Sequence, residues 1–222
     1  MPAQHTQHRR DTGTTWAEYC SLSMLLALLV GTALLYFERD LLEPLRYHRA
    51  ALFDEPWRLL SHAFVHINQF QLTANLSVLA CLYFLFSKAF ASLWWVVALL
   101  ASALAVALGL YYYSPNLTWI AGLWGALHGL FLYAVLRSRA SALWLLALAA
   151  KLVLEQSGVG VLVAPLFGWV PDSWAFFSTA ALLDNPAAIN ANLWGSAGGL
   201  FFYFLVRGTA TMLVFLDVAR AR

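Results

Sequence analysis

Residues 121–131 read Ala-Gly-Leu-Trp-Gly-Ala-Leu-His-Gly-Leu-Phe and open a long apolar run. Gly125 and Gly129 are four residues apart, so on a helix they share one face, where a second helix can approach closely. Residues 192–201 repeat the pattern Leu-Trp-Gly-x-x-x-Gly-Leu-Phe, with Gly195 and Gly199 in the same places. The repeat predicts two helices packed backbone to backbone, with any chemistry near their first turns. The alternative is two ordinary packing faces in a membrane, with no site.

The composition of the whole chain indicates a membrane protein. Of its 222 residues, 62% are hydrophobic and only 11% are charged, and the mean hydropathy is +0.70. A soluble domain carries far more polar surface. A net charge of +2 without a basic stripe argues against nucleic acid as a partner. Cys20 and Cys81 both lie in apolar runs, which argues against a structural disulfide, and no metal or cofactor is expected.

The apolar runs predict an all-α polytopic membrane protein with six transmembrane helices. Residues 1–16 are expected to form a polar tail, 17–207 the membrane domain and 208–222 a second tail with amphipathic character. A long connection, residues 38–69, holds four arginines and five acidic residues. The first expected span, about residues 19–37, is long enough to cross a bilayer at 1.5 Å per residue. The expected spans are about 19–37, 70–87, 93–113, 117–136, 142–156 and 187–206.

The distribution of basic residues predicts the orientation of the spans. If the spans alternate, Lys88, Arg137, Arg139 and Arg207 fall on the same side as the N-terminal tail. Cytoplasmic loops carry the excess of lysine and arginine. Both termini are therefore expected to be cytoplasmic.

Unusual polar side chains occur at one depth in the even-numbered spans. Gln71 and Asn75 lie in span 2, and Asn192 lies in span 6 at the depth of Trp124 in span 4. A further pair, His62 and His66, comes just before span 2. Polar groups inside a membrane usually face the bundle interior or a wet cavity. Two interpretations stay open, namely hydrogen bonds that join helices and the lining of a cavity.

Three motifs, in order along the chain, resemble those of the rhomboid intramembrane proteases, and most closely the bacterial rhombosortases. Residues 57–68 (Trp-Arg-Leu-Leu-Ser-His-Ala-Phe-Val-His-Ile-Asn), continuing to Asn75, resemble the family's first loop and second span. Residues 122–130 resemble its Gly-x-Ser-Gly serine motif, and residues 191–195 its histidine motif. Lys151 and Glu155 also suit the rhombosortase pattern. The resemblance covers about residues 20–207 and implies a six-helix rhomboid-like bundle.

The resemblance also implies that the catalytic residues are substituted. Trp124 stands at the family's nucleophilic serine, Asn192 at its general-base histidine and Gln71 at a histidine near its oxyanion site, whereas Asn75, His62 and His66 match. An indole has no nucleophilic atom, and a carboxamide cannot accept a proton near neutral pH. An oxyanion site alone does not catalyse cleavage of a peptide bond, because a nucleophile must still attack the carbonyl carbon. The sequence therefore predicts a pseudoprotease with no intact catalytic pair.

Two further pairs of polar residues have both a functional and a structural interpretation. Ser196 and His128 each follow one of the substituted positions by one helical turn, so they form a conceivable replacement pair. Interhelical packing is the simpler interpretation of His128. Lys151 and Glu155 are four residues apart, a spacing that favours an ion pair within one helix over a proton relay.

The function expected from this reasoning is binding without catalysis. The chain is expected to bind transmembrane or C-terminal anchor segments of client proteins in a bacterial inner membrane, with membrane lipid and an active rhombosortase as further partners. The first alternative is an active intramembrane serine endopeptidase with a rearranged site. The second is a transporter of small molecules or an unrelated membrane scaffold.

Overall fold

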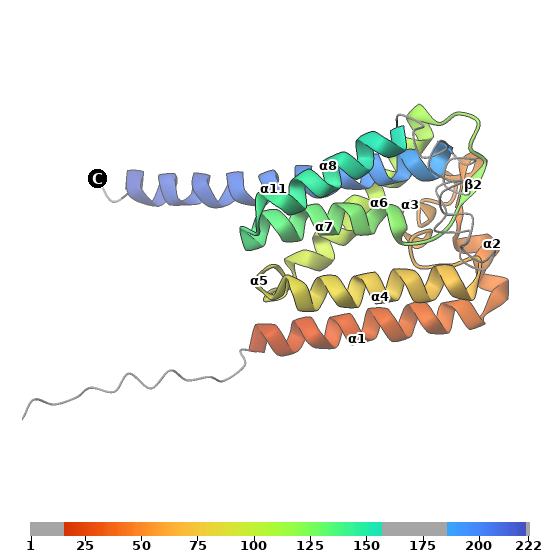
Figure 1. Ribbon diagram of the computed structural model, residues 1–222, viewed down its shortest axis with the longest axis horizontal. Coiled ribbons are helices and arrows are strands. Elements are labelled where there is room, and N and C mark those ends of the chain that lie inside the picture. The colour runs from red at the N-terminus through yellow and green to blue at the C-terminus, as the bar shows by residue number, and fades with distance from the viewer. Residues whose placement is uncertain (1–15, 157–185, 221–222) are drawn as a thin grey trace, which may run out of the picture.

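The computed structural model describes residues 16–156 and 186–220, which are mostly helical (Figure 1). Within these residues the bundle consists of six longer helices, and most of the short elements lie in the connection between α1 and α4. The longer helices are α1 (Trp16–Phe37), α4 (Gln69–Leu85), α6 (Trp94–Tyr113), α7 (Trp124–Ser138) and α8 (Ala142–Gln156), followed by α11 (Pro186–Arg220). The short helical elements are η1 (Arg39–Leu41), α2 (Leu42–Leu45), η2 (Arg49–Ala51), α3 (Arg58–Ser61) and α5 (Ser87–Phe90).

The centre of the bundle is formed by α7, α11 and α6. A Cβ atom added at Gly129 would lie less than 3.0 Å from the carbonyl oxygen of Gly195, and one added at Gly199 equally close to that of Gly129. One added at Gly125 would lie 2.9 Å from the carbonyl oxygen of Ala191. Real Cβ atoms do not come so close, so only glycine permits this approach of the two backbones.

A second set of contacts attaches α1 to the bundle. The hydroxyl of Ser21 donates to the carbonyl oxygen of Phe90 at 2.5 Å and accepts from the indole N–H of Trp95 at 2.8 Å. All three residues are buried. Much of the rest of α1 is exposed, as expected for a helix with one side facing lipid.

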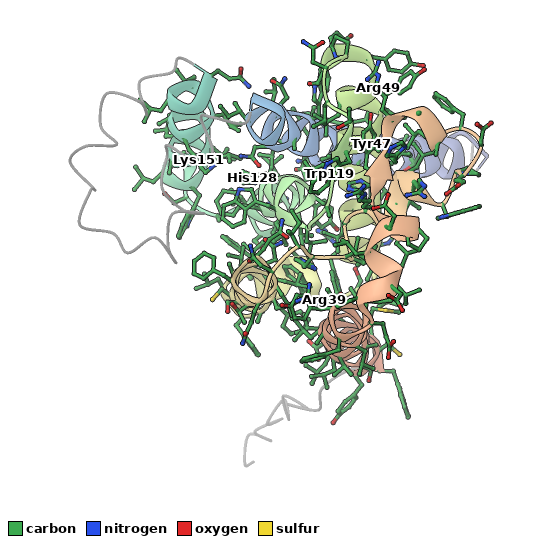
Figure 2. The ribbon with its side chains drawn as sticks, turned by 90° about the vertical axis from the view of Figure 1, so that its right-hand side faces the viewer. Arg39, Tyr47, Arg49, Trp119, His128 and Lys151 are labelled. Atoms are coloured by element: carbon green, nitrogen blue, oxygen red, sulfur yellow. The ribbon has the colours of Figure 1, made fainter. Side chains whose placement is uncertain are left out.

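The connection between α1 and α4 is a folded unit held by long-range contacts. Arg58 donates to the carbonyl oxygens of Glu43 and Arg46, both at 2.7 Å, and its Nε is 2.6 Å from a carboxylate oxygen of Glu55. A two-residue strand, β1 (Tyr47–His48), pairs antiparallel with β2 (Trp119–Ile120), which precedes α7. In this register Tyr47 lies opposite Ile120 and His48 opposite Trp119, and Figure 2 shows Tyr47 and Trp119 on the two neighbouring strands.

The structure corrects two of the expected boundaries. Span 4 was expected at 117–136, but α7 begins at Trp124 and ends at Ser138, because residues 119–120 pair with β1 and Gly122 has a φ of +116°. Span 6 was expected at 187–206, with a separate tail, but α11 continues to Arg220 without a break. In Figure 1 its end projects beyond the other helices. The expected tail 1–16, apart from Trp16, and residues 157–185 lie outside the described residues.

Two described helices, α1 and α6, are long and apolar enough to cross a bilayer by length and composition. Shorter apolar helices are α4 and residues 142–154 of α8. A bundle of six spans with cytoplasmic termini stays a prediction.

Candidate functional site

Gln71 connects the start of α4 to the residues that lead into α7. Its side-chain Nε2 donates to the carbonyl oxygen of Ala121 at 2.8 Å, and its Oε1 accepts from the backbone N–H of Ile67 at 2.9 Å. A Cβ atom at Gly122 would collide with the Gln71 amide. The backbone N–H of Gly122 donates to the carbonyl oxygen of His62 at 2.8 Å. Gln71 therefore fixes the turn that positions Trp124.

Asn75 lies one turn further along α4, on the same inner face as Gln71. Asn68 caps the N-terminus of α4, and its side chain accepts from the backbone N–H of Gln71 at 2.8 Å. The amide nitrogen of Asn75 lies 2.9 Å from Nε2 of His66. An amide nitrogen can only donate, so His66 accepts through Nε2 and carries its hydrogen on Nδ1. Both side chains are almost completely buried.

His62 lies before α4, at the base of the folded connection. Its Nε2 donates to the carbonyl oxygen of Ala103 at 3.2 Å, and its ring meets the ring of Tyr47 edge to face at 6.4 Å. Burial lowers the pKa of His62 and that of His66 to about 4. Both imidazoles are therefore neutral at pH 7.

Trp124 is the first residue of α7, and its ring packs on His128. The two ring centroids are 5.3 Å apart at an interplanar angle of 73°. Nδ1 of His128 donates to the carbonyl oxygen of Trp124 at 2.9 Å. This bond fixes the tautomer of His128 and holds its ring against its own helix.

Asn192 lies on α11 beside the first turn of α7, next to Ala191, and its side chain has no exposed surface. Ser196, one turn later, donates from its hydroxyl to the carbonyl oxygen of Asn192 at 2.8 Å. Within the described part of the chain, no hydrogen bond joins Ser196 to His128. Each of these two side chains instead bonds a carbonyl oxygen of its own helix. A replacement pair would require both bonds to break.

A cavity of about 240 Å³ opens between α4, α7 and α8. Trp124 and His128 form its wall on α7, and Lys151 contributes from α8, with its Nζ 6.0 Å from the Trp124 ring centroid. Figure 2 shows Lys151 and His128 next to each other, where α8 faces α7. The other lining residues are apolar, namely Val78, Leu82, Leu127, Phe131, Trp144, Ala147 and Leu148.

The apolar lining of the cavity was not predicted from the sequence. Val78, Leu82 and Leu148 are ordinary members of apolar helices, so nothing in the sequence distinguishes them from lipid-facing or core residues. The side chain of Glu155 lies outside the described residues, so its pairing with Lys151 stays a prediction. Among residues 16–156 and 186–220, no group of three or more His, Cys, Asp or Glu side chains could hold a metal ion.

The family model for the Rhomboid domain matches residues 54–209 of the chain. This range contains α4, α6, α7 and α8, and it includes every residue discussed above as a candidate site. No curated protein shows a significant match to this chain.

Proposed function

Because the chain belongs to the rhomboid family, we propose that it is an intramembrane protease-like protein that binds transmembrane segments without cleaving them. Its membrane domain is a six-span bundle of the bacterial inner membrane, with both termini in the cytoplasm. The motifs around residues 57–75, 122–130 and 191–195 support a rhombosortase-like member of the family. The clients are then transmembrane or C-terminal anchor segments, and an active rhombosortase is a candidate partner.

The observation that carries this proposal is the indole of Trp124 at the first residue of α7. In the family resemblance this position belongs to the nucleophilic serine. A serine hydroxyl attacks a peptide carbonyl once a neighbouring base removes its proton. Trp124 offers no such atom, and its ring occupies one wall of the cavity. A substrate bound there meets an aromatic surface in place of a nucleophile.

Two further features support the absence of catalysis. The position assigned to the base is Asn192, whose carboxamide cannot take a proton near neutral pH. The side chains nearest to an oxyanion role, Gln71 and Asn75, already donate to Ala121 and His66. Because these two amide groups already donate to acceptors within the protein, they do not point to the place where an oxyanion would form.

Binding is supported by the cavity between α4, α7 and α8. Its walls are mostly apolar side chains from three helices, so it suits an apolar segment packed against them. Trp144 and Phe131 stack edge to face at 5.9 Å and give it a rigid aromatic border. Aromatic anchors of this kind are common in binding surfaces.

Site-specific photocrosslinking tests where a client binds. A photoreactive amino acid replaces Ala147, which lines the cavity, or its neighbour Leu146, which is 63% exposed and does not line it. The purified full chain is reconstituted in nanodiscs with a synthetic single-span peptide. We expect peptide adducts at position 147 and few at position 146. Equal yields at both positions would contradict binding in the cavity.

A fluorophosphonate probe distinguishes this proposal from an active serine protease. The probe labels only activated serines, and we expect no labelling of the purified protein. Labelling that disappears with Ser196→Ala but not with Ser102→Ala would favour the rearranged enzyme. Ser102 is a suitable control because it is also buried and also bonds a carbonyl oxygen four residues earlier.

A further inference from the structure

A second cavity, of about 450 Å³, lies along α1 and is distinct from the one that Trp124 lines. Most of its lining comes from α1 between Ala27 and Leu35, and the two cavities share no lining residue. Glu38 lines it just beyond the end of the helix, and Phe64 lines it from the connection before α4. We call this cavity the α1 groove. Its volume is in the range typical of ligand sites.

Gly31 leaves the middle of the α1 groove open. A Cβ atom added there would meet nothing within 4 Å, whereas one added at Gly129 would collide with the backbone of Gly195. The glycine in α1 therefore does not serve the close packing of two helices. An apolar recess that no side chain fills loses van der Waals contacts along its walls. In a bilayer a hydrocarbon chain, which is as apolar as leucine, restores these contacts.

Thr32 brings a polar group to the wall of the α1 groove. The residue is only 4% exposed, and it lines the groove. Among residues 16–156 and 186–220, no side chain or backbone group forms a hydrogen bond with its hydroxyl. Buried hydroxyl groups are normally hydrogen-bonded. A ligand of the groove is therefore expected to carry an acceptor at the depth of Thr32.

Glu38 places a negative charge at the mouth of the α1 groove. Its side chain is exposed, and within the described part of the chain it forms no ion pair. Residues 157–185, which are outside that part, contain no lysine, arginine or histidine. The carboxylate is therefore available to a cationic group of a ligand.

Arg39 adds a positive charge directly after Glu38. Its guanidinium lies over the Tyr36 ring, 3.9 Å from the centroid, and donates to the carbonyl oxygen of Ile67 at 3.1 Å and to the hydroxyl of Tyr36. A guanidinium has five N–H donors, so donors remain for an anion. Figure 2 shows Arg39 where α1 ends. The end of α1 thus offers one acidic and one basic side chain.

We propose that the α1 groove binds one phospholipid with an ethanolamine headgroup. The ammonium group of the lipid binds Glu38, and its phosphate binds Arg39. An ester carbonyl oxygen accepts from the hydroxyl of Thr32, and one acyl chain lies along α1 past Gly31 towards Ala27. This site does not depend on the proposed binding of client segments.

The dimensions of the groove agree with this occupant. Ala27 lies about 17 Å from Glu38 along the axis of α1, and one leaflet contributes about 15 Å to the hydrocarbon core of a bilayer. Thr32 lies about 9 Å from Glu38 along the same axis. The headgroup region of one leaflet is about 5–8 Å deep. Thr32 is therefore close to the boundary at which the ester groups lie.

The charges at the mouth favour a lipid over a transmembrane helix as the occupant. A zwitterionic headgroup carries both complementary charges at one point, next to two apolar chains. An apolar span of a second copy or of a client offers neither charge at that depth. An anionic headgroup without an amine would satisfy Arg39 and would be repelled by Glu38.

Lipid titrations of the purified full chain, read by native mass spectrometry, test the proposal. Phosphatidylethanolamine, phosphatidylcholine and phosphatidylglycerol with identical acyl chains are compared. We expect phosphatidylethanolamine to bind about threefold more tightly than phosphatidylcholine, as for an exposed charge pair, because a trimethylated ammonium cannot donate a hydrogen bond. Glu38→Gln should remove this preference. The matched control Asp40→Asn should keep it, because Asp40 is also exposed but does not line the groove.

A second pair of variants locates the bound lipid. Gly31→Leu places a side chain in the open middle of the groove without a collision at its Cβ. We expect this variant to lose the tightest lipid site. Gly208→Leu is the matched control, because a Cβ at Gly208 also meets nothing within 4 Å and Gly208 does not line the groove.

Equal affinity of the wild-type protein for the ethanolamine and choline lipids would refute recognition of the ammonium group. Tighter binding of phosphatidylglycerol would refute it as well. An unchanged preference in Glu38→Gln, or unchanged binding in Gly31→Leu, would place the lipid elsewhere. A dimer that only Gly31→Leu dissociates would assign the groove to a second copy and overturn the proposal.

The comparison of the three lipids on the wild-type protein holds even if a variant does not fold. Failure of this proposal is also distinguishable from failure of the proposed function. Client binding is tested by photocrosslinking at position 147, which lies in the other cavity.

Discussion

At the scale of single residues, Gln71 shows how this chain uses a polar side chain inside an apolar bundle. Its amide satisfies one backbone acceptor before α7 and one backbone donor before α4. Backbone groups outside regular structure are costly when buried without partners. Gln71 therefore has a structural role at the position that the family resemblance associates with the oxyanion site.

Replacing Gln71 by alanine tests this structural role. The variant leaves the Ala121 carbonyl and the Ile67 N–H without their partner, so we expect a loss of about 1–3 kcal/mol in the free energy of unfolding. Thermal unfolding in detergent provides the measurement. Gln69→Ala is the matched control, since Gln69 is exposed at the first position of the same helix. Similar melting temperatures for the two variants would contradict the role given to Gln71.

The two buried histidines before α4 predict a dependence of stability on pH. Burial lowers their pKa from the ordinary value of 6.5 to about 4. Between these two values the unfolded chain takes up protons that the folded chain does not. Stability is therefore complete above pH 6.5 and falls as the pH drops towards 4, by about 1.4 kcal/mol per pH unit for each histidine.

Melting temperatures at several pH values between 7 and 4 test this expectation. His62→Gln keeps a donor for the carbonyl oxygen of Ala103 but does not titrate. Its stability should therefore decline less steeply than that of the wild-type protein. If the melting temperatures of both proteins fell equally with pH, His62 would not contribute to the pH dependence of stability.

At the scale of elements, the packing of α7 on α11 is the feature that the sequence predicts most directly. The four-residue spacing of the glycines places them on one face, and in the structure that face meets the backbone of the other helix. Contacts of this kind depend on local periodicity, which a sequence displays. The start of α7 was predicted wrongly, because it depends on β1, about 70 residues earlier in the chain.

Gly129→Ala should destabilise the pair of helices. The added Cβ would collide with the carbonyl oxygen of Gly195 and with the side chain of Ser102, and neither helix can shift without losing other contacts. We expect a loss of at least about 1–3 kcal/mol, typical of overpacking, read as a lower melting temperature. Gly31→Ala is the matched control, because a Cβ there meets nothing within 4 Å. Its effect should stay within about 0.5–1 kcal/mol.

The folded connection between α1 and α4 could not be predicted from its composition. The sequence shows only a long connection with four arginines and five acidic residues. In the structure, Arg58 joins Glu43, Arg46 and Glu55, and residues 47–48 pair with the segment before α7. Such contacts link residues that no short-range pattern relates.

At the scale of the whole molecule, the match to the Rhomboid domain confirms membership of the rhomboid family. The closer relationship to rhombosortases and the six-span topology stay predictions. The family could be suggested from the sequence because each family motif is a short, continuous stretch of residues. The cavity depends on how α4, α7 and α8 pack, and apolar residues alone do not reveal that packing.

Fusions to reporter enzymes test the topology. If both termini are cytoplasmic, alkaline phosphatase should be active when fused after Asn116, between α6 and α7, and inactive when fused after Arg139 or Arg222. A fluorescent protein fused after Arg222 should fluoresce. Phosphatase activity at the C-terminal fusion would contradict the orientation.

The central claim is that this chain holds a membrane-embedded segment at a site where Trp124 and Asn192 leave no group to attack it. The most direct measurement is mass spectrometry of a single-span peptide after incubation with the full chain in proteoliposomes. We expect the peptide to keep its full mass and to be found bound to the protein. Cleavage products that appear with the wild-type protein and disappear with Ser196→Ala would contradict it.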